Sequence, residues 1–196
     1  MLPMTGPCRE PVGALPVSIS EAPGQTPTPP PPRQPGPVPN NNMHLRRTVR
    51  FASLSEAVTD AERVCAADAA GQLIRKGNWT AGQALGHLAT WINFGFEGYP
   101  ITAPPEAAGK SQARKPLALR EGLFAGVRLP GVEGGTAGIE VLPREEGLRR
   151  FTEACARLER STPTHPHPFF GALSREEWLL LHLRHAELHL SYLHVD

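Results

Sequence analysis

The chain has 196 residues, with 20 lysines and arginines against 19 aspartates and glutamates, giving a formal net charge of +1. This balance creates no general basic field, so nucleic-acid binding through phosphate neutralisation is not expected. No apolar run approaches the roughly 18 residues that span a bilayer, and no hydrophobic secretory segment opens the sequence. Three scattered cysteines form no disulfide framework. We therefore expect a soluble, cytoplasmic protein without membrane or nucleic-acid partners.

Proline is concentrated at the N-terminus, where 13 of the 22 prolines lie in residues 1–40. Proline donates no backbone hydrogen bond, and this segment has no aromatic residue with which to build a core. We predict a disordered, proline-rich tail over residues 1–42. Met43 opens a different composition and is a candidate translation start, which would leave the tail untranslated. Residues 43–196 are long enough for one compact domain.

Helical periodicity predicts two helices in the first half of this domain. The first is expected from Ser53, which forms a capping box with Glu56, to about residue 76, before Gly77. The second begins at Thr80, with Gln83 three residues later, and ends around residues 95–98. The expected inner faces are Leu54, Val58, Ala61, Cys65, Ala69 and Leu73 in the first helix, and Leu85, Leu88 and Ile92, flanked by Ala84, His87 and Trp91, in the second.

Two further helices are predicted in the second half. The third follows Pro143 and reaches about Arg160, with an apolar stripe of Leu148, Phe151, Cys155 and Leu158. The fourth starts at Ser174, which Glu177 completes as a capping box, and continues to about Leu193. No strand pattern is evident, so the predicted fold class is all-α.

About 40 residues rich in glycine and proline, 99–142, separate the second predicted helix from the third. Antiparallel neighbours need only a short loop, whereas parallel neighbours need a connection along the whole bundle. We therefore predict a four-helix bundle whose middle helices run parallel, joined by a long crossover with a short helix near residues 118–127. The GVEGGTAG stretch within it follows no strand and is assigned no phosphate-binding role.

Histidines form a stripe along the fourth predicted helix. Its members follow one another at intervals of four, three, four and three residues, namely Trp178, His182, His185, His189 and Tyr192. His185 and His189 are an i, i+4 pair that can reach one metal ion, and His87 of the second helix lies on an otherwise apolar flank. Buried imidazoles without partners would each cost about 1–3 kcal/mol, a penalty that a divalent ion removes. The alternative is half-buried histidines bonded to water or to the backbone.

His182 lies one turn before His185 and is either a fourth ligand or a hydrogen-bond donor behind a ligand; we favour the latter. The zinc-peptidase motif HExxH is absent, because Ala186 follows His185 and Glu187 points away around the helix.

Four segments, GNWTAGQALGHLATWI, HPFFG, LSREEW and LRHAELHL, together resemble the DinB-like superfamily, and most closely its branch known only as a domain of unknown function. The resemblance covers nearly all of residues 45–194. It implies a four-helix bundle with parallel middle helices and a metal site formed by His87, His185 and His189. Many relatives carry two adjacent histidines at the end of the last motif; here the first of these positions is Leu188.

Three neutral imidazoles leave a coordination position open for water or substrate. Zn, Ni, Cu and Fe all accept such ligands, so the sequence does not select the metal. Characterised DinB-like relatives include metal-dependent transferases and isomerases that use small thiols. The resemblance therefore implies a metal-dependent thiol transferase acting on an electrophile, and a homodimer as an expectation. A hydrolase is the variant in which the ion activates bound water. The alternative is a non-catalytic bundle with a structural metal. No general base or other catalytic residue is identified.

The roles of several other residues can be interpreted in two ways. His165 and His167 form either a pocket lid or, as we favour, a rigid turn. Trp79 either supports His87 or, more simply, packs against the first turn of its helix. The basic residues before the first helix, Arg46, Arg47 and Arg50, are expected to be solvated.

Overall fold

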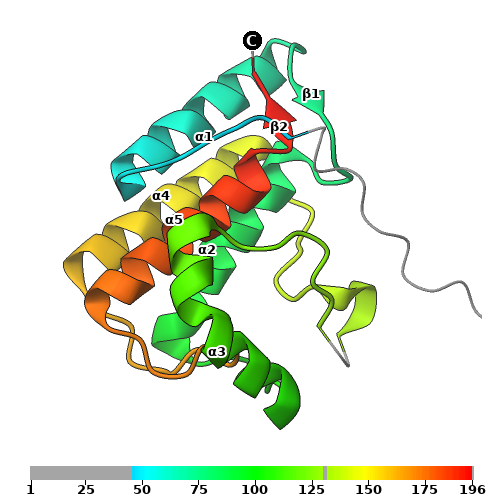
Figure 1. Ribbon diagram of the computed structural model, residues 1–196. Helices are drawn as coiled ribbons and strands as arrows, with labels where there is room; N and C mark the ends of the chain where they lie inside the picture. The colour runs from blue at the N-terminus through cyan, green and yellow to red at the C-terminus, as the bar shows by residue number, and fades with distance from the viewer. Residues whose placement is uncertain (1–45, 130–131, 196) are drawn as a thin grey trace, which may run out of the picture. The chain divides into compact units, whose positions relative to one another are not determined.

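The computed structural model describes residues 46–129 and 132–195, all of which belong to the compact unit Pro39–Asp196. The prediction for residues 1–42 lies outside this part of the chain. The described residues are mostly helical, which confirms the predicted class. None of their helices combines the length and apolar character needed to traverse a bilayer. The elements are α1 (Leu54–Ala69), β1 (Ile74–Arg75), α2 (Ala81–Glu97), α3 (Pro105–Glu121), the 3-10 helix η2 (Glu133–Gly135), α4 (Arg144–Arg160), α5 (Arg175–Leu190) and β2 (Leu193–His194) (Figure 1).

The predicted helix starts are confirmed. At α1, the Ser53 side chain accepts a hydrogen bond from the Glu56 backbone N–H. At α2 and α5 the capping box is complete, because the N3 side chain also accepts from the backbone N–H of the capping residue. These bonds satisfy N–H groups that have no partner within the helix. α4 begins after Pro143 and ends at Arg160, as predicted.

Two helix ends were predicted too late. α1 ends at Ala69, because Gly71 takes a left-handed conformation (φ 70°) and the N–H groups of Gly71 and Gln72 bond back to Asp68 and Ala67. Glycine adopts this turn without the steric cost that a side chain would add. Ala69 is therefore exposed rather than buried. α5 likewise ends at Leu190 instead of Leu193.

The residues released from these two helix ends form a small antiparallel sheet, which was not predicted. Ile74 of β1 pairs with His194 of β2, and Arg75 pairs with Leu193. The sheet ties the chain after α1 to the chain after α5. It therefore fixes the C-terminal end of α5, which carries His189.

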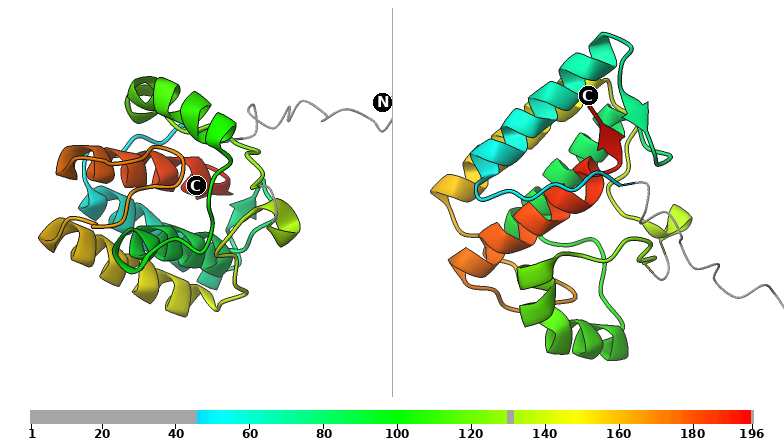
Figure 2. Two further views of the ribbon diagram at one scale, coloured as in Figure 1. Left: turned by 90° about the horizontal axis from the view of Figure 1, so that it is seen from below. Right: turned by 45° about the horizontal axis from the view of Figure 1, so that its top comes forward.

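The connection between α2 and α4 contains a 17-residue helix, α3, rather than the short helix expected near residues 118–127. Pro105 occupies its first turn, where a missing N–H is tolerated, but Pro116 lies inside it. Only Ala118 and Leu119 of α3 are buried, and the helix packs against α5. Figure 2 shows α3 next to α5 in the view from below. Most of this helix was not predicted, because Pro116 lies inside it and its mostly polar sequence shows no helical spacing of apolar residues.

α2 and α4 run in the same direction and make the most extensive contact of any helix pair among the described residues. At their N-terminal ends, a Cβ on Gly147 would lie 2.7 Å from the Gly82 carbonyl oxygen. At their C-terminal ends, the Gly95 carbonyl accepts from the N–H of Thr164, just after α4. The connection therefore returns along the length of α2. The view from below in Figure 2 shows the two helices side by side.

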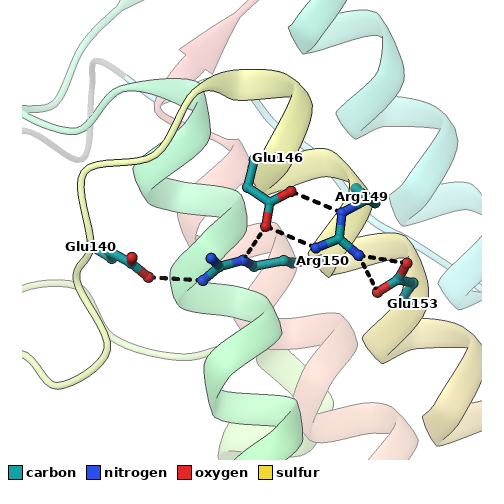
Figure 3. A network of polar contacts seen from close by, with 5 residues as sticks. All are labelled: Glu140, Glu146, Arg149, Arg150 and Glu153. Atoms are coloured by element: carbon teal, nitrogen blue, oxygen red, sulfur yellow. Dashed lines mark hydrogen bonds and ion pairs between the residues drawn. The ribbon is translucent and has the colours of Figure 1, made fainter.

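The outer face of α4 carries charged side chains that pair with one another (Figure 3). Glu146 accepts from Arg149 and Arg150, Arg149 also bonds to Glu153, and Arg150 also bonds to Glu140 in the preceding loop. The hydrogen bonds from Arg149 and Arg150 lower the pKa of Glu146 to about 2. Exposed ion pairs of this kind contribute little to stability, so this face is a solvated surface.

The close approach of α2 and α4 predicts a sharp difference between two glycine-to-alanine substitutions. Gly147→Ala places a methyl group against the α2 backbone, and we expect the free energy of unfolding to fall by about 1–3 kcal/mol. Gly109→Ala, in α3 with no atom within 4 Å of the added Cβ, should raise it by up to about 1 kcal/mol. Urea denaturation of both variants measures this. Equal effects would contradict the tight α2–α4 contact.

Candidate metal centre

Three imidazoles from two helices converge at one point. His87 comes from α2, and His185 and His189 come from adjacent turns of α5. Nε2 of His185 lies 3.2 Å from Nε2 of His87 and 3.1 Å from Nε2 of His189. The candidate ligand atoms of all three residues lie within 4.8 Å of one another. His87 is buried, with 2% of its surface exposed, whereas His185 and His189 are half-buried. The three histidines singled out from the sequence are thus brought together, close enough to bind one metal ion.

A backbone carbonyl fixes the orientation and tautomer of His87. Nδ1 of His87 lies 3.0 Å from the carbonyl oxygen of Ala137, which also accepts from Nε1 of Trp91 at 3.1 Å. A carbonyl only accepts hydrogen bonds, so Nδ1 of His87 carries the proton and Nε2 presents its lone pair. Histidine ligands in metal sites are commonly oriented by a bond of this kind on the other ring nitrogen.

The spacing of the nitrogens fits a shared metal ion. Two nitrogens bound at about 2.0–2.1 Å in tetrahedral geometry stand about 3.3 Å apart, close to the two distances found here. If Nε2 of His185 carried a proton, it could donate a hydrogen bond to Nε2 of only one of His87 and His189 at a time. A single metal cation would instead accept the lone pairs of all three nitrogens. The donor set therefore suits a divalent ion better than a hydrogen-bonded histidine cluster.

The site keeps these imidazoles neutral. Burial lowers the pKa of His87 to about 4, partly offset by its bond to the Ala137 carbonyl. Burial also holds the pKa of His185 and His189 well below the usual value, and the neighbouring histidines lower both further. Neutral imidazole is the form that binds metal, so at neutral pH all three rings are in the ligand form.

Trp79 has a larger role than the helix-packing one favoured from the sequence. Its indole stacks on the ring of His189, with centroids 4.8 Å apart and planes 11° apart, and meets His87 edge-on at 4.9 Å. Trp79 therefore contacts one imidazole from each helix and restricts how both rings can turn.

His182 does not belong to the convergent group. Its ring is 3% exposed and stacks on Trp178 with centroids 5.7 Å apart, and neither ring nitrogen bonds to any described residue. Trp178 is a buried core residue. Burial lowers the pKa of His182 to about 3, so this ring is neutral in the folded protein.

The segment before α5 forms a rigid turn. Nδ1 of His167 accepts from the backbone N–H groups of Phe169 and Phe170, both at 3.2 Å, and His167 pairs with Gly171 across the turn. His167 is buried, and burial lowers its pKa to about 3. His165 is instead exposed and lines a surface pocket of about 300 Å³ with Tyr99, Ile101 and Pro166 among others.

Glu187 points away from the imidazoles, as its position on the helix predicted, but into a buried ionic network rather than solvent. It pairs with Arg184 of α5 and with Arg50, and accepts from the N–H of Phe51 at 2.8 Å. Arg47 pairs with the buried carboxylate of Asp60 in α1. The expectation of a solvated side chain was therefore wrong for Arg47, whereas Arg50 is exposed while it pairs with Glu187. These contacts anchor the chain before α1 to the α5 helix.

Sequence reasoning missed Ala137 as a contributor to the site. Ala137 acts through its carbonyl, so its side chain gives no signal, and it lies in the GVEGGTAG stretch to which no role was assigned. Three glycines in this segment have positive φ, at 134, 135 and 138, and a Cβ on Gly138 would lie 2.8 Å from the Thr90 side chain. This concentration of glycines signals a backbone that must pass close to α2.

A family model described as "Protein of unknown function (DUF1569)" matches residues 43–195. The chain belongs to this family. Comparisons with curated proteins and with solved structures gave no match. The family description assigns no activity, so the function of this DUF1569 member has to be argued from its own residues.

The buried neutral histidines predict a loss of stability in acid. The pKa of His182 is about 3 in the folded protein, against about 6.5 in an unfolded chain. Between these pH values the unfolded chain binds a proton that the folded protein excludes. The free energy of unfolding is therefore highest above pH 6.5 and falls as pH drops toward 3, by up to about 1.4 kcal/mol per pH unit for this residue.

His182→Phe retains an aromatic ring against Trp178 and removes the titration, so its stability should fall less steeply between pH 6 and 4. Urea denaturation of metal-free protein across this range measures the slope. His165→Phe, at an exposed position, is the matched control and should retain the wild-type slope. A slope unchanged in His182→Phe would show that His182 is not held neutral.

Proposed function

We propose that this protein binds a divalent metal ion through His87, His185 and His189 and uses it in a transfer reaction of a small thiol. The observation that carries the proposal is the convergence of three Nε2 atoms, two pairs of them 3.1–3.2 Å apart, with the Nε2 lone pair of His87 set by the Ala137 carbonyl. The half-burial of His185 and His189 supports access to the ion from one side.

His87, His185 and His189 would hold the divalent ion, which when bound would supply Lewis-acid chemistry that lowers the pKa of a thiol or water and favours a nucleophile near neutral pH. In the proposed reaction, the thiolate sulfur forms a bond to an electrophilic carbon, the leaving group departs with its electron pair, and the thiol proton passes to solvent. The chain contributes orientation: the Ala137 carbonyl and Trp79 fix the imidazoles. The same site with bound water would serve a hydrolase.

We further propose that α1, α2, α4 and α5 form the four-helix bundle of DinB-like proteins. The shared direction of α2 and α4 and the long connection between them support this assignment, and α3 then lies within the crossover. The resemblance to small-thiol transferases in that superfamily supports thiol transfer as the reaction class.

A structural role for the metal is the second candidate. His87 belongs to α2 and the other two ligands to α5, so a bound ion would tie two helices together. In that case the ion would stabilise the fold without taking part in a reaction.

Metal analysis of untagged protein tests the ligand assignment. We expect about one divalent ion per chain in the wild type, and a metal content at least about tenfold lower in His87→Ala and His185→Ala, since each loses a ligand. His165→Ala, which removes an exposed histidine, should keep the wild-type content. Equal metal content in all three variants would refute the assignment.

The thermal midpoint of metal-free and metal-loaded protein separates the two roles. A catalytic ion should stabilise the protein slightly, exchange its bound water rapidly, and promote conjugation of a small thiol to an electrophile in Zn- or Ni-loaded protein. A structural ion should raise the midpoint strongly and show no exchangeable water. Confirmed metal binding without conjugation of any common thiol would exclude the transferase.

A further inference from the structure

The chain before α1 lies along the C-terminal end of α5 and brings Arg46 to Ser191 and Tyr192, the residues just beyond the ligand-bearing end of that helix. The backbone N–H of Arg47 donates to the Ser191 carbonyl at 2.9 Å, and Nε of Arg46 donates to the Ser191 hydroxyl at 2.7 Å. The Arg46 guanidinium also lies over the ring of Tyr192, 5.2 Å from its centroid. Ser191 and Tyr192 lie two and three residues after His189, and the Tyr192 N–H bonds back to the His189 carbonyl.

Arg46 differs from its two basic neighbours in having no carboxylate partner among the described residues. Arg47 pairs with Asp60 and Arg50 pairs with Glu187, so each of those charges is offset within the fold. The Ser191 hydroxyl and the Tyr192 ring hold the Arg46 side chain in place but leave its charge uncompensated. Arg46 is half-buried, so it is positioned and still accessible.

The charged groups near the three imidazoles are cationic rather than anionic. Arg46 bonds to Ser191, two residues after His189, so its positive charge lies at the end of α5 that carries this ligand. Within the described part of the chain, no aspartate or glutamate joins the convergent group. A divalent ion on three neutral imidazoles would add two positive charges that no carboxylate there balances. Such a site favours a ligand that supplies negative charge in two places, one on the metal and one beside it.

We propose that Arg46 is a specificity-determining residue. Its guanidinium would bind a carboxylate of the substrate, while the thiolate of the same substrate would bind the metal ion held by His87, His185 and His189. A guanidinium presents a planar pair of N–H groups that matches a carboxylate, and charge-assisted bonds of this kind are stronger than neutral ones. The inference rests on the proposed metal site and narrows its substrate to small thiols that carry a carboxylate. The other role open to Arg46 is purely structural, as a cation at the C-terminal end of α5.

Two thiols of equal length test this assignment on the full chain loaded with Co²⁺, whose thiolate complexes absorb visible light. The probes are 4-mercaptobutanoate, which carries a carboxylate, and 4-mercaptobutan-1-ol, which does not. We expect the wild type to bind the carboxylate thiol about 10- to 100-fold more tightly, as for one hydrogen bond between charged groups. In Arg46→Gln this preference should fall to about twofold or less, while the affinity for the alcohol stays the same.

Arg46→Lys should keep part of the preference, and Arg160→Gln, an exposed arginine at the end of α4, should keep all of it. Any direct binding of the carboxylate to cobalt is common to all variants and cancels in the comparison. A lower thermal midpoint in Arg46→Gln with an undiminished preference would mean that Arg46 only caps α5, which overturns the proposal. Equal affinity of the two thiols for the wild type overturns it without any variant. Failure of Co²⁺ to bind the wild type would instead overturn the proposed metal site, and the role of Arg46 with it.

Discussion

The candidate site depends on one hydrogen bond, from Nδ1 of His87 to the Ala137 carbonyl. Without it, the buried imidazole could carry its proton on either nitrogen, and Nε2 would point a hydrogen rather than a lone pair at His185. With it, α2 supplies one fixed donor atom to a point where α5 supplies two. The Trp91 indole bonds to the same carbonyl, so two side chains of α2 hold the loop from which that carbonyl comes. The loop and the helix thus fix each other.

The other half of the site depends on the position of α5, and that position is set from both ends. The capping box at Ser174 fixes where the helix begins. Near its C-terminal end, Glu187 bonds to Arg184, Arg50 and Phe51, and β2 pairs with β1. Removing one partner from a buried network of this kind leaves a charge unpaired, at a cost that usually exceeds the net gain from forming the pair. The network therefore specifies one placement of α5, and with it the placement of His185 and His189.

The sequence predicted the parts of this protein that depend on local patterns. Capping residues and apolar spacing located the starts of four helices, and the four-residue interval between His185 and His189 identified a pair on one face. The end of α1 was missed because Leu73 continued the apolar spacing beyond Gly71, whose left-handed turn ends the helix. α3 was missed because Pro116 and few apolar residues hide a helix that packs through only Ala118 and Leu119. The roles of Ala137, Trp79 and Arg46 arise from contacts between segments distant in sequence, which spacing along one helix does not encode.

The distribution of burial within the site bears on whether a bound ion would be reactive. Closed structural zinc sites surround the metal with four protein ligands, whereas catalytic sites supply three and leave one position for water or substrate. His182, one turn before His185, is the nearest candidate for a fourth ligand, yet it stacks on Trp178 and stays outside the convergent group. The buried member, His87, lies on α2, and the half-buried pair lies on α5, beyond whose C-terminal end Arg46 bonds to Ser191. An ion held there would be covered on the side of the buried His87 and more accessible on the side of the half-buried His185 and His189, where an exchangeable ligand could reach it.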